Sequence, residues 1–369
     1  MPSSHESSRT TPRELGIPLG NFSPAPLNGI TDVAGVRVGE VTIVAPAGAA
    51  HGAIRTGVTC IWPHESWPWE QAVYAGATVL NGHGELIGIC QLQEWGLLRS
   101  PIMLTSSLSI GAVYDAVARW SAEQDPALSR RNFFMPVVTE VSDLALSDNR
   151  AFPITFAHVA EALESAHAGR PLEGGVGAGT GTVCYDLKGG IGTSSRVVPH
   201  DGGAWTLGAL VLTNYGERRN LTLAGVPVGA QLDLPIPPSM PTEGSAIVVL
   251  ATDAPLGPHQ LSRLATRGAV GLTRSGAFVG QTSGEIAIAF STANRVAVEP
   301  APALDVELVA DGFNPVFNAL FEASMEAVHE AVLNSLFAAE TTTGFLDVVV
   351  PALPVEQTAR MLRERGAIA

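Results

Sequence analysis

The part of the chain that most constrains its fold is a stiff connector that runs straight into a short apolar segment. Four prolines lie between residues 235 and 241, and Gly244 and Ser245 lead into the apolar run 246–251. This run is rich in β-branched residues and is short enough to be a buried strand. Ser245 is therefore expected where an exposed connector enters a core strand.

The Gly244–Ser245 peptide bond is a candidate for self-cleavage. Proline restricts φ and stiffens the approach, whereas glycine permits backbone conformations that other residues resist. Cleavage of a strained bond here would leave Ser245 as a new N-terminus, with a hydroxyl group and a free amine on one residue. The alternative, on these residues alone, is an ordinary turn.

The composition excludes several classes of protein. The 369 residues allow one large domain or two of ordinary size, and 46% hydrophobic against 15% charged residues suits a large interior and extensive subunit interfaces. The net charge of −14 and a single lysine, Lys188, exclude a multi-lysine patch for nucleic acid. We therefore expect no nucleic-acid partner.

The cysteines and histidines are scattered. Cys60, Cys90 and Cys184 are too few for a disulfide framework and fit thiols in a reducing compartment. The nine histidines form no HxH or HExxH pattern, so we expect no metal. No N-terminal apolar signal segment and no run of about 18 apolar residues occurs, which predicts a cytoplasmic protein without a membrane partner.

The order of predicted elements favours an α+β layered fold. Residues 1–25 are expected to be a flexible leader, and residues 26–369 a single catalytic domain. Strands and helices then follow without the regular βαβ repeat of a doubly wound sheet. The apolar runs 74–80 and 86–92 are broken by a turn at 81–84. The glycine-rich segment 173–196 lacks GxGxxG, GxxxxGK[ST] and GxSxG, so it predicts neither a phosphate loop nor a nucleophile elbow.

A serine at a new N-terminus has a base on the same residue. A hydroxyl group is a poor nucleophile unless a base takes its proton, and an α-amine has a reference pKa of about 7.7–8.0. Asn214, at the end of a predicted strand, carries an amide suited to stabilising an oxyanion. Ser283 and Glu285 are two residues apart in a predicted strand and so share a face. They form a candidate hydrogen-bond network with Ser245; the alternative is that Glu285 is a solvated residue on an edge strand.

Taken together, these stretches resemble the self-cleaving aminopeptidases that include the L-aminopeptidase/D-amidase/D-esterase DmpA and the β-peptidyl aminopeptidases. The resemblance covers nearly the whole chain after the leader. The motifs that carry it are Ile30-Thr-Asp-Val-Ala-Gly-Val-Arg-Val-Gly39, Arg55-Thr-Gly-Val-Thr59, Leu80-Asn-Gly-His-Gly-Glu85, Gly177-Ala-Gly-Thr-Gly181, Lys188-Gly-Gly-Ile-Gly-Thr-Ser-Ser-Arg196, Asn214-Tyr-Gly216, Gly244-Ser245, Ala251-Thr-Asp-Ala-Pro-Leu256 and Ser283-Gly-Glu285.

The resemblance implies an αββα sandwich of the N-terminal-nucleophile type, without a cofactor. It implies cleavage at Gly244–Ser245 into an α chain of 1–244 and a β chain of 245–369, assembled as a tetramer of cleaved protomers. In it, Ser245 matches the nucleophile and Asn214 the oxyanion-hole residue. Ser283 and Glu285 match the supporting pair, and Glu140 the carboxylate that receives the substrate's ammonium group.

The chain departs from the family pattern in two places. The family commonly has Glu-x-Tyr-Asp where this chain has Glu140-Val-Ser142-Asp143, so a tyrosine is replaced by Ser142. Thr105-Ser-Ser107 stands where Thr-Asn-Thr is expected. Both changes leave the nucleophile intact and bear on substrate preference and rate.

We predict an aminopeptidase or amidase that acts on short peptides, amides or esters with a free amine. The residues leave open whether the first residue of the substrate is an L-, D- or β-amino acid. The alternatives are acyl transfer, as in the more distant ornithine acetyltransferases, and an unprocessed non-catalytic homologue.

Overall fold

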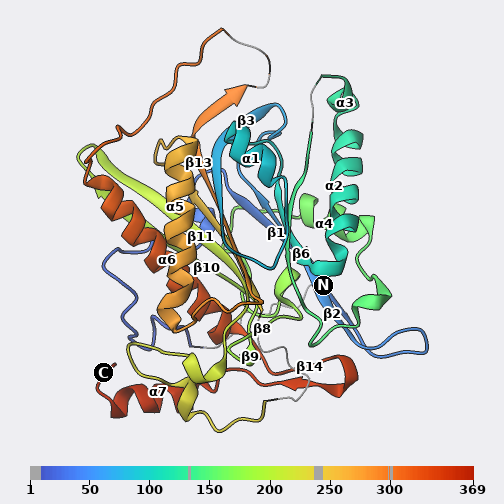
Figure 1. Cartoon of the computed structure of the whole chain (residues 1–369), viewed down its shortest axis with the longest axis vertical. Coiled ribbons are helices and arrows are strands. Elements are labelled where there is room, and N and C mark those ends of the chain that lie inside the picture. The colour runs from blue at the N-terminus through green and yellow to red at the C-terminus, as the bar shows by residue number, and fades with distance from the viewer. Residues whose placement is uncertain (1–9, 132–133, 237–243, 298, 300–301) are drawn as a thin grey trace.

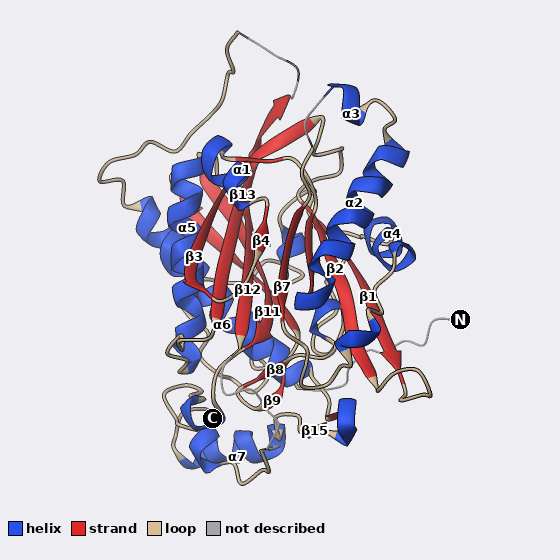
Figure 2. Cartoon of the chain, turned by 45° about the vertical axis from the view of Figure 1, so that its right-hand side comes forward, coloured by secondary structure: helices blue, strands red, loops and turns tan. Residues whose placement is uncertain are grey.

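The protein is a four-layered sandwich in which two β-sheets pack face to face between two layers of helices (Figure 2). The computed structural model describes residues 10–369 except 132–133, 237–243, 298 and 300–301. Pro237, Pro238 and Pro241 of the connector therefore lie outside the described residues. The αββα architecture predicted from the sequence is confirmed.

The two sheets are built from segments far apart in the chain. In the six-stranded sheet the order is β10 (Ile191–His200), β11 (Gly203–Asn214), β12 (Ser245–Thr252), β13 (Gly284–Ala297), β3 (Gln71–Gly82) and β5 (Leu97–Leu98). In the five-stranded sheet the order is β1 (Arg37–Ala45), β2 (Ile54–Trp62), β6 (Ile102–Ser106), β7 (Val137–Val141) and β4 (Leu86–Ile87).

Helices cover the outer face of each sheet. Helices α5 (Pro258–Gly271) and α6 (Val316–Ala338) pack on the six-stranded sheet, and α2 (Ile110–Gln124) and α4 (Phe156–Glu164) on the five-stranded sheet (Figure 1). The remaining elements are peripheral: α1 (Ile89–Trp95), α3 (Leu128–Arg131), α7 (Val355–Glu364), and the two small hairpins β8 (Val183–Cys184) with β9 (Leu187–Lys188) and β14 (Thr342–Thr343) with β15 (Val349–Val350).

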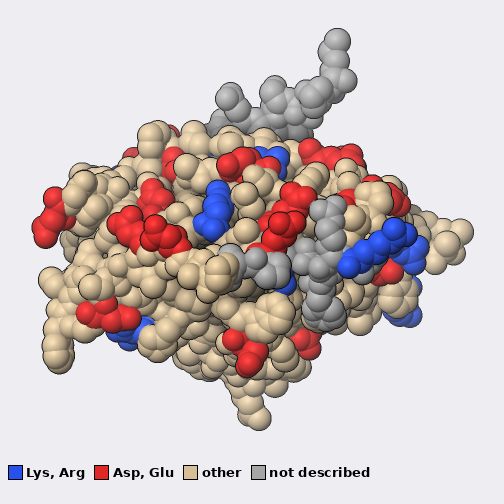
Figure 3. All heavy atoms as spheres, turned by 90° about the horizontal axis from the view of Figure 1, so that it is seen from above, with Lys and Arg blue, Asp and Glu red and all other residues tan. Residues whose placement is uncertain are grey.

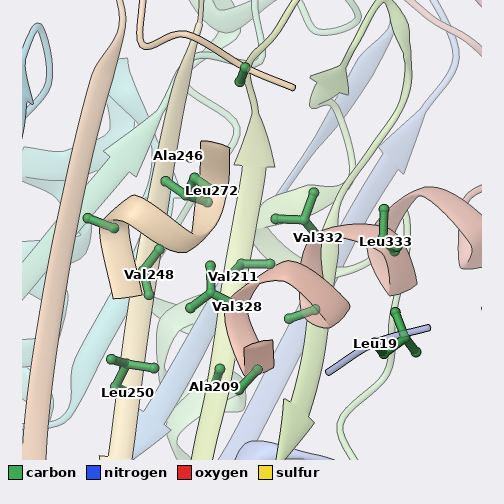
Figure 4. Close-up of a cluster of buried hydrophobic side chains, with 14 of the residues drawn as sticks. Leu19, Ala209, Val211, Ala246, Val248, Leu250, Leu272, Val328, Val332 and Leu333 are labelled. Atoms are coloured by element: carbon green, nitrogen blue, oxygen red, sulfur yellow. The ribbon is translucent and has the colours of Figure 1, made fainter. Parts of the chain in front are cut away.

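Strand β12 lies at the centre of the fold and is buried along its whole length. It pairs antiparallel with β11 and parallel with β13. Because side chains alternate along a strand, Ile247 and Val249 pack between the two sheets, whereas Val248 and Leu250 pack against the helices (Figure 4). Complete burial of each such side chain contributes about 1.5–3 kcal/mol. The continuous apolar run therefore reports burial on both faces, as the sequence predicted.

The prediction of a flexible leader is wrong for residues 10–25. Ile17 and Leu19 are buried in the same apolar cluster as residues of α6, and Leu19 is shown with that cluster in Figure 4. Arg13 forms an ion pair with Glu330 of α6, with 2.6 Å between Arg13 Nε and Glu330 Oε1. Two contacts with α6 hold this segment in place: its apolar side chains pack against the helix, and Arg13 pairs with a buried carboxylate. Neither contact can be predicted from the local sequence.

Candidate active site

Ser245 is the first residue of β12 and lies between the ends of its two neighbouring strands. In the strand register it is opposite Asn214, the last residue of β11, and opposite Gly284, the first residue of β13. Its side chain is on the same side as those of Ile247 and Val249, between the sheets. Ser245 Oγ lies 3.5 Å from the carbonyl oxygen of His83. The serine is 8% exposed, so solvent reaches it.

Asn214 is held in one orientation by the β8 hairpin. Its Oδ1 accepts a hydrogen bond from the backbone N–H of Val183 at 2.9 Å. The amide donor Nδ2 is therefore directed to the other side, where it lies 3.2 Å from the position that a Cβ atom on Gly244 would take. The sequence did not identify Val183, because the contact is made by a backbone group and leaves no side-chain signature.

Residue 244 must be glycine in this geometry. A Cβ atom there would stand 1.7 Å from the backbone oxygen of Asn214. The carbonyl oxygen of Gly244 accepts a hydrogen bond from the N–H of Gly284 at 3.1 Å. The peptide bond before Ser245 is thus fixed on one side by β11 and on the other by β13.

Ser283 and Glu285 form the expected pair, and both are buried. Ser283 Oγ donates a hydrogen bond to the Glu285 carboxylate. Glu285 is fully buried, and β13 is an internal strand between β12 and β3. The alternative that Glu285 is a solvated residue on an edge strand is therefore wrong.

The Ser283–Glu285 pair lies on the face of the sheet opposite to the one that carries the Ser245 side chain. Because Gly284 is the register partner of Ser245, alternation places the flanking Ser283 and Glu285 side chains on the opposite, helix-facing side of the sheet. They line a small cleft together with Gly244, residues 215–217 and residues 277–280. Gly244, the residue that precedes Ser245, is one of the residues that line this cleft.

Glu140 lies on β7 of the other sheet, across a turn from Ser245. Its Oε1 accepts a hydrogen bond from the backbone N–H of Glu85 at 3.0 Å, and its Oε2 accepts one from Ser107 Oγ. The turn at 83–85 separates it from Ser245. A Cβ atom on Gly84 would stand 3.5 Å from Glu140 Oε1, and one on Gly284 would stand 2.5 Å from the His83 oxygen. Glycine at 284 is what lets the turn approach the strand.

The two departures from the family motif have different surroundings. Ser107, where threonine was expected, supplies the hydroxyl group that binds Glu140. Ser142 Oγ lies 3.5 Å from the backbone N–H of Leu144, so it faces its own loop. Asp143 beside it is fully enclosed; burial raises the pKa of its carboxyl group to about 6, while a hydrogen bond from Asn149 opposes that shift.

The comparison with known proteins decides the family. The model of peptidase family S58 matches residues 28–350. The chain belongs to peptidase family S58. As a member, it is an enzyme, a serine-type aminopeptidase with an N-terminal-nucleophile fold.

Sequence relatives and solved structures of this peptidase family match over almost the whole chain. The chain is 40% identical to the β-peptidyl aminopeptidase BapA of Sphingosinicella xenopeptidilytica over 368 residues, covering 96% of this chain and 91% of the relative. A β-aminopeptidase from Burkholderia sp. matches with a TM-score of 0.89 and 42% identity, covering 97% of this chain and 99% of that one. The L-aminopeptidase D-Ala-esterase/amidase from Ochrobactrum anthropi, described as a prototype for the serine aminopeptidases and a variant of the Ntn hydrolase fold, matches with a TM-score of 0.91 and 41% identity over the same shares.

Two further properties of the described residues bear on partners. No helix in the described part is long and apolar enough to cross a lipid bilayer. On the face shown in Figure 3, acidic and basic side chains are interspersed, with the acidic ones more widely spread. This distribution agrees with the net charge of −14.

Proposed function

We propose that this peptidase cuts itself between Gly244 and Ser245, giving an α chain of 1–244 and a β chain of 245–369. In the cut, Ser245 Oγ attacks the Gly244 carbonyl carbon, the C–N bond breaks, and the hydroxyl proton passes to the departing nitrogen. Water then hydrolyses the resulting ester, which leaves a carboxylate on Gly244 and a free amine on Ser245. The observation that carries this proposal is the bond itself: its carbonyl oxygen accepts a hydrogen bond from the Gly284 N–H, and Gly244 lies closely against Asn214 at the end of β11.

In the hydrolytic cycle, each polar group at the site has one task. Ser245 Oγ attacks the carbonyl carbon of the substrate's first residue, and its own α-amine accepts the hydroxyl proton. Ser283 and Glu285 orient that amine from the helix-facing cleft. Asn214 Nδ2 donates to the developing oxyanion. The α-amine returns this proton to the leaving amine, which departs as the acyl-enzyme forms; water then attacks the ester, its proton passes through the α-amine to Ser245 Oγ, and the free acid is released.

Glu140 is proposed to bind the ammonium group of the substrate. Its carboxylate is fixed by the Glu85 N–H and Ser107 Oγ, and it lies across the 83–85 turn from the nucleophile. A fixed carboxylate selects substrates with a free amine, because an acylated nitrogen carries no charge to pair with it. This position supports aminopeptidase rather than endopeptidase action.

The substrates are proposed to be short peptides, amides and esters whose first residue is an L-, D- or β-amino acid. The relatives named above are called β-peptidyl aminopeptidase and L-aminopeptidase D-Ala-esterase/amidase, which supports this range. The test is hydrolysis of a panel of L-, D- and β-aminoacyl amides, each paired with its N-acetyl derivative. The proposal requires turnover only of the free amines; equal turnover of the acetylated members would contradict it.

A homo-oligomer, a tetramer of αβ protomers, is also proposed. The low share of charged residues, 15%, supports extensive subunit contacts. Light scattering on the purified protein would test it, and a mass near 38.3 kDa for a single chain would contradict it. Cytoplasmic location stays a prediction.

A further inference from the structure

A second polar cavity, of about 290 Å³, lies outside the proposed catalytic groups. It is lined by Val44 and Arg55 at the ends of β1 and β2, by Gly175 and Thr180, and by residues 341–343 of the β14 hairpin. These segments meet at the end of the molecule that carries β8, β9 and β14 (Figure 1). The cavity shares no lining residue with the cleft beside Ser283.

One wall of the cavity carries a fixed positive charge. Arg55 Nη1 donates to the backbone oxygens of Ala45 at 3.0 Å and Ile54 at 2.7 Å. These two hydrogen bonds fix one nitrogen of the guanidinium group where β1 ends and β2 begins. Arg55 is the only charged residue among the lining residues, so no carboxylate of the lining neutralises it.

A second positive charge, that of Lys188, lies next to the lining residue Gly175. The Lys188 ammonium is fully buried, and its Nζ lies 3.4 Å from the position that a Cβ atom on Gly175 would take. Nζ donates to the backbone oxygens of Gly179 at 2.9 Å and Gly189 at 2.7 Å. This ammonium therefore lies next to Gly175, a residue that lines the cavity.

The charge of Lys188 is poorly compensated. Burial lowers the pKa of its ammonium group to about 7, and the nearby Cys184 thiol and Asp143 carboxyl oppose that shift only in part. Two basic residues, Arg55 and Lys188, therefore lie at or next to one polar cavity, although the chain has 35 acidic and only 21 basic residues. The Thr180 and Thr342 hydroxyls donate to the backbone oxygens of Gly177 and Glu340, whereas those of Thr341 and Thr343 can donate a neutral hydrogen bond into the cavity.

We propose that this cavity is a binding site for a small oxyanion, a carboxylate or a phosphate, with Arg55 and the Thr341 and Thr343 hydroxyls as direct donors and Lys188 as the counter-charge beside Gly175. A guanidinium group and hydroxyl groups match the planar or tetrahedral oxygens of such anions. Binding stabilises the ammonium form of Lys188, so the anion binds more weakly as the pH rises through the pKa of that group.

The single lysine gives a direct readout. In full-length protein labelled with ¹³C at the lysine ε-carbon, one resonance reports on Lys188. We expect inorganic phosphate or acetate, added at constant ionic strength with chloride as the balancing ion, to shift this resonance saturably and to raise the pKa measured from it. Tighter binding of acetate identifies a carboxylate as the ligand class, and tighter binding of phosphate identifies a phosphate.

A substitution at Gly175 separates a built site from a chance ion. The atoms nearest to a Cβ atom at 175 are the end of the Lys188 side chain at 3.4 Å and the Thr180 backbone oxygen at 3.9 Å, which are ordinary contacts. Gly175→Asp supplies its own carboxylate, so we expect a raised Lys188 pKa and no further response to phosphate. Gly175→Asn, equal in size and uncharged, is the control for filling the cavity and should leave the pKa close to that of the wild type.

Thr343→Val tests the hydroxyl groups without touching the cations. Thr343 is exposed on the β14 hairpin, and its loss should weaken the binding of the tighter anion severalfold. A resonance that phosphate and acetate leave unmoved would overturn the proposal. So would an undiminished response in Gly175→Asp, which would mean an adventitious ion only.

Discussion

Gly244→Ala is the most informative substitution, because one methyl group tests the geometry of the bond that is proposed to cleave itself. The added Cβ atom would stand 1.7 Å from the backbone oxygen of Asn214, whereas real Cβ contacts are essentially never shorter than 3.0 Å. The residue must therefore move by at least 1.3 Å relative to the end of β11. The carbonyl that Ser245 attacks moves with it.

The size of the effect follows from that displacement. A misplacement of about 1 Å in a reacting group reduces rates by roughly 100-fold. We therefore expect Gly244→Ala to slow self-cleavage by about two orders of magnitude or more. Denaturing gels of purified protein sampled over time measure the conversion of one band into two, and circular dichroism shows whether the chain is folded.

Gly82→Ala is the matched control. Gly82 is the register partner of Gly284 at the end of β3, and a Cβ atom there meets only the Val79 side chain at 3.8 Å. It should be cleaved at the wild-type rate. A folded Gly244→Ala protein that was cleaved as fast as Gly82→Ala would refute the assigned geometry.

Three further substitutions test other groups. Glu140→Gln should raise KM for free-amine substrates by at least tenfold, with a smaller effect on kcat. Ser107→Ala should raise KM only severalfold, because it removes one hydrogen bond to the Glu140 carboxylate and leaves the carboxylate in place. Steady-state kinetics measure both variants, and unchanged KM values would argue against ammonium binding by Glu140. Glu285→Gln should lower kcat by about 100-fold, which is the range for loss of an acid–base partner. The kcat is measured on protein that a denaturing gel shows as two bands, and full activity would exclude Glu285 from the mechanism. For Asp143, the folded-state pKa of about 6 lies above the unfolded value of 3.8, so the folded state favours the protonated form and the carboxyl contributes stability at low pH that is lost as pH rises from about 4 through 6. Urea unfolding at pH 4 and pH 7 should show the wild type losing roughly 2 kcal/mol relative to Asp143→Asn over that range, and parallel pH profiles would contradict the burial argument.

Much of the framework was accessible from the sequence because it rests on local patterns. The run 246–251 is apolar at every position, which is what a central strand buried on both faces requires. The spacing of Ser283 and Glu285 predicts a shared face, and the structure joins the two side chains by a hydrogen bond. The order of elements predicted an α+β layered fold in the same way, whereas the αββα arrangement was implied by the family resemblance.

The contacts that complete the site are long-range, and no local pattern encodes them. The Val183 N–H that orients Asn214 comes from a hairpin 31 residues away, and Ser107 is 33 residues from Glu140. The run 86–92 reads as one apolar segment, yet it divides into the two residues of β4 and the start of α1. Short apolar runs do not distinguish strand from helix, because tertiary pairing decides between them.

Intact mass spectrometry of enzyme with demonstrated aminopeptidase activity tests the central claim most directly. The account predicts two polypeptides, residues 1–244 and 245–369, with serine at the N-terminus of the smaller one. Full activity from a single uncut chain of 369 residues would contradict it.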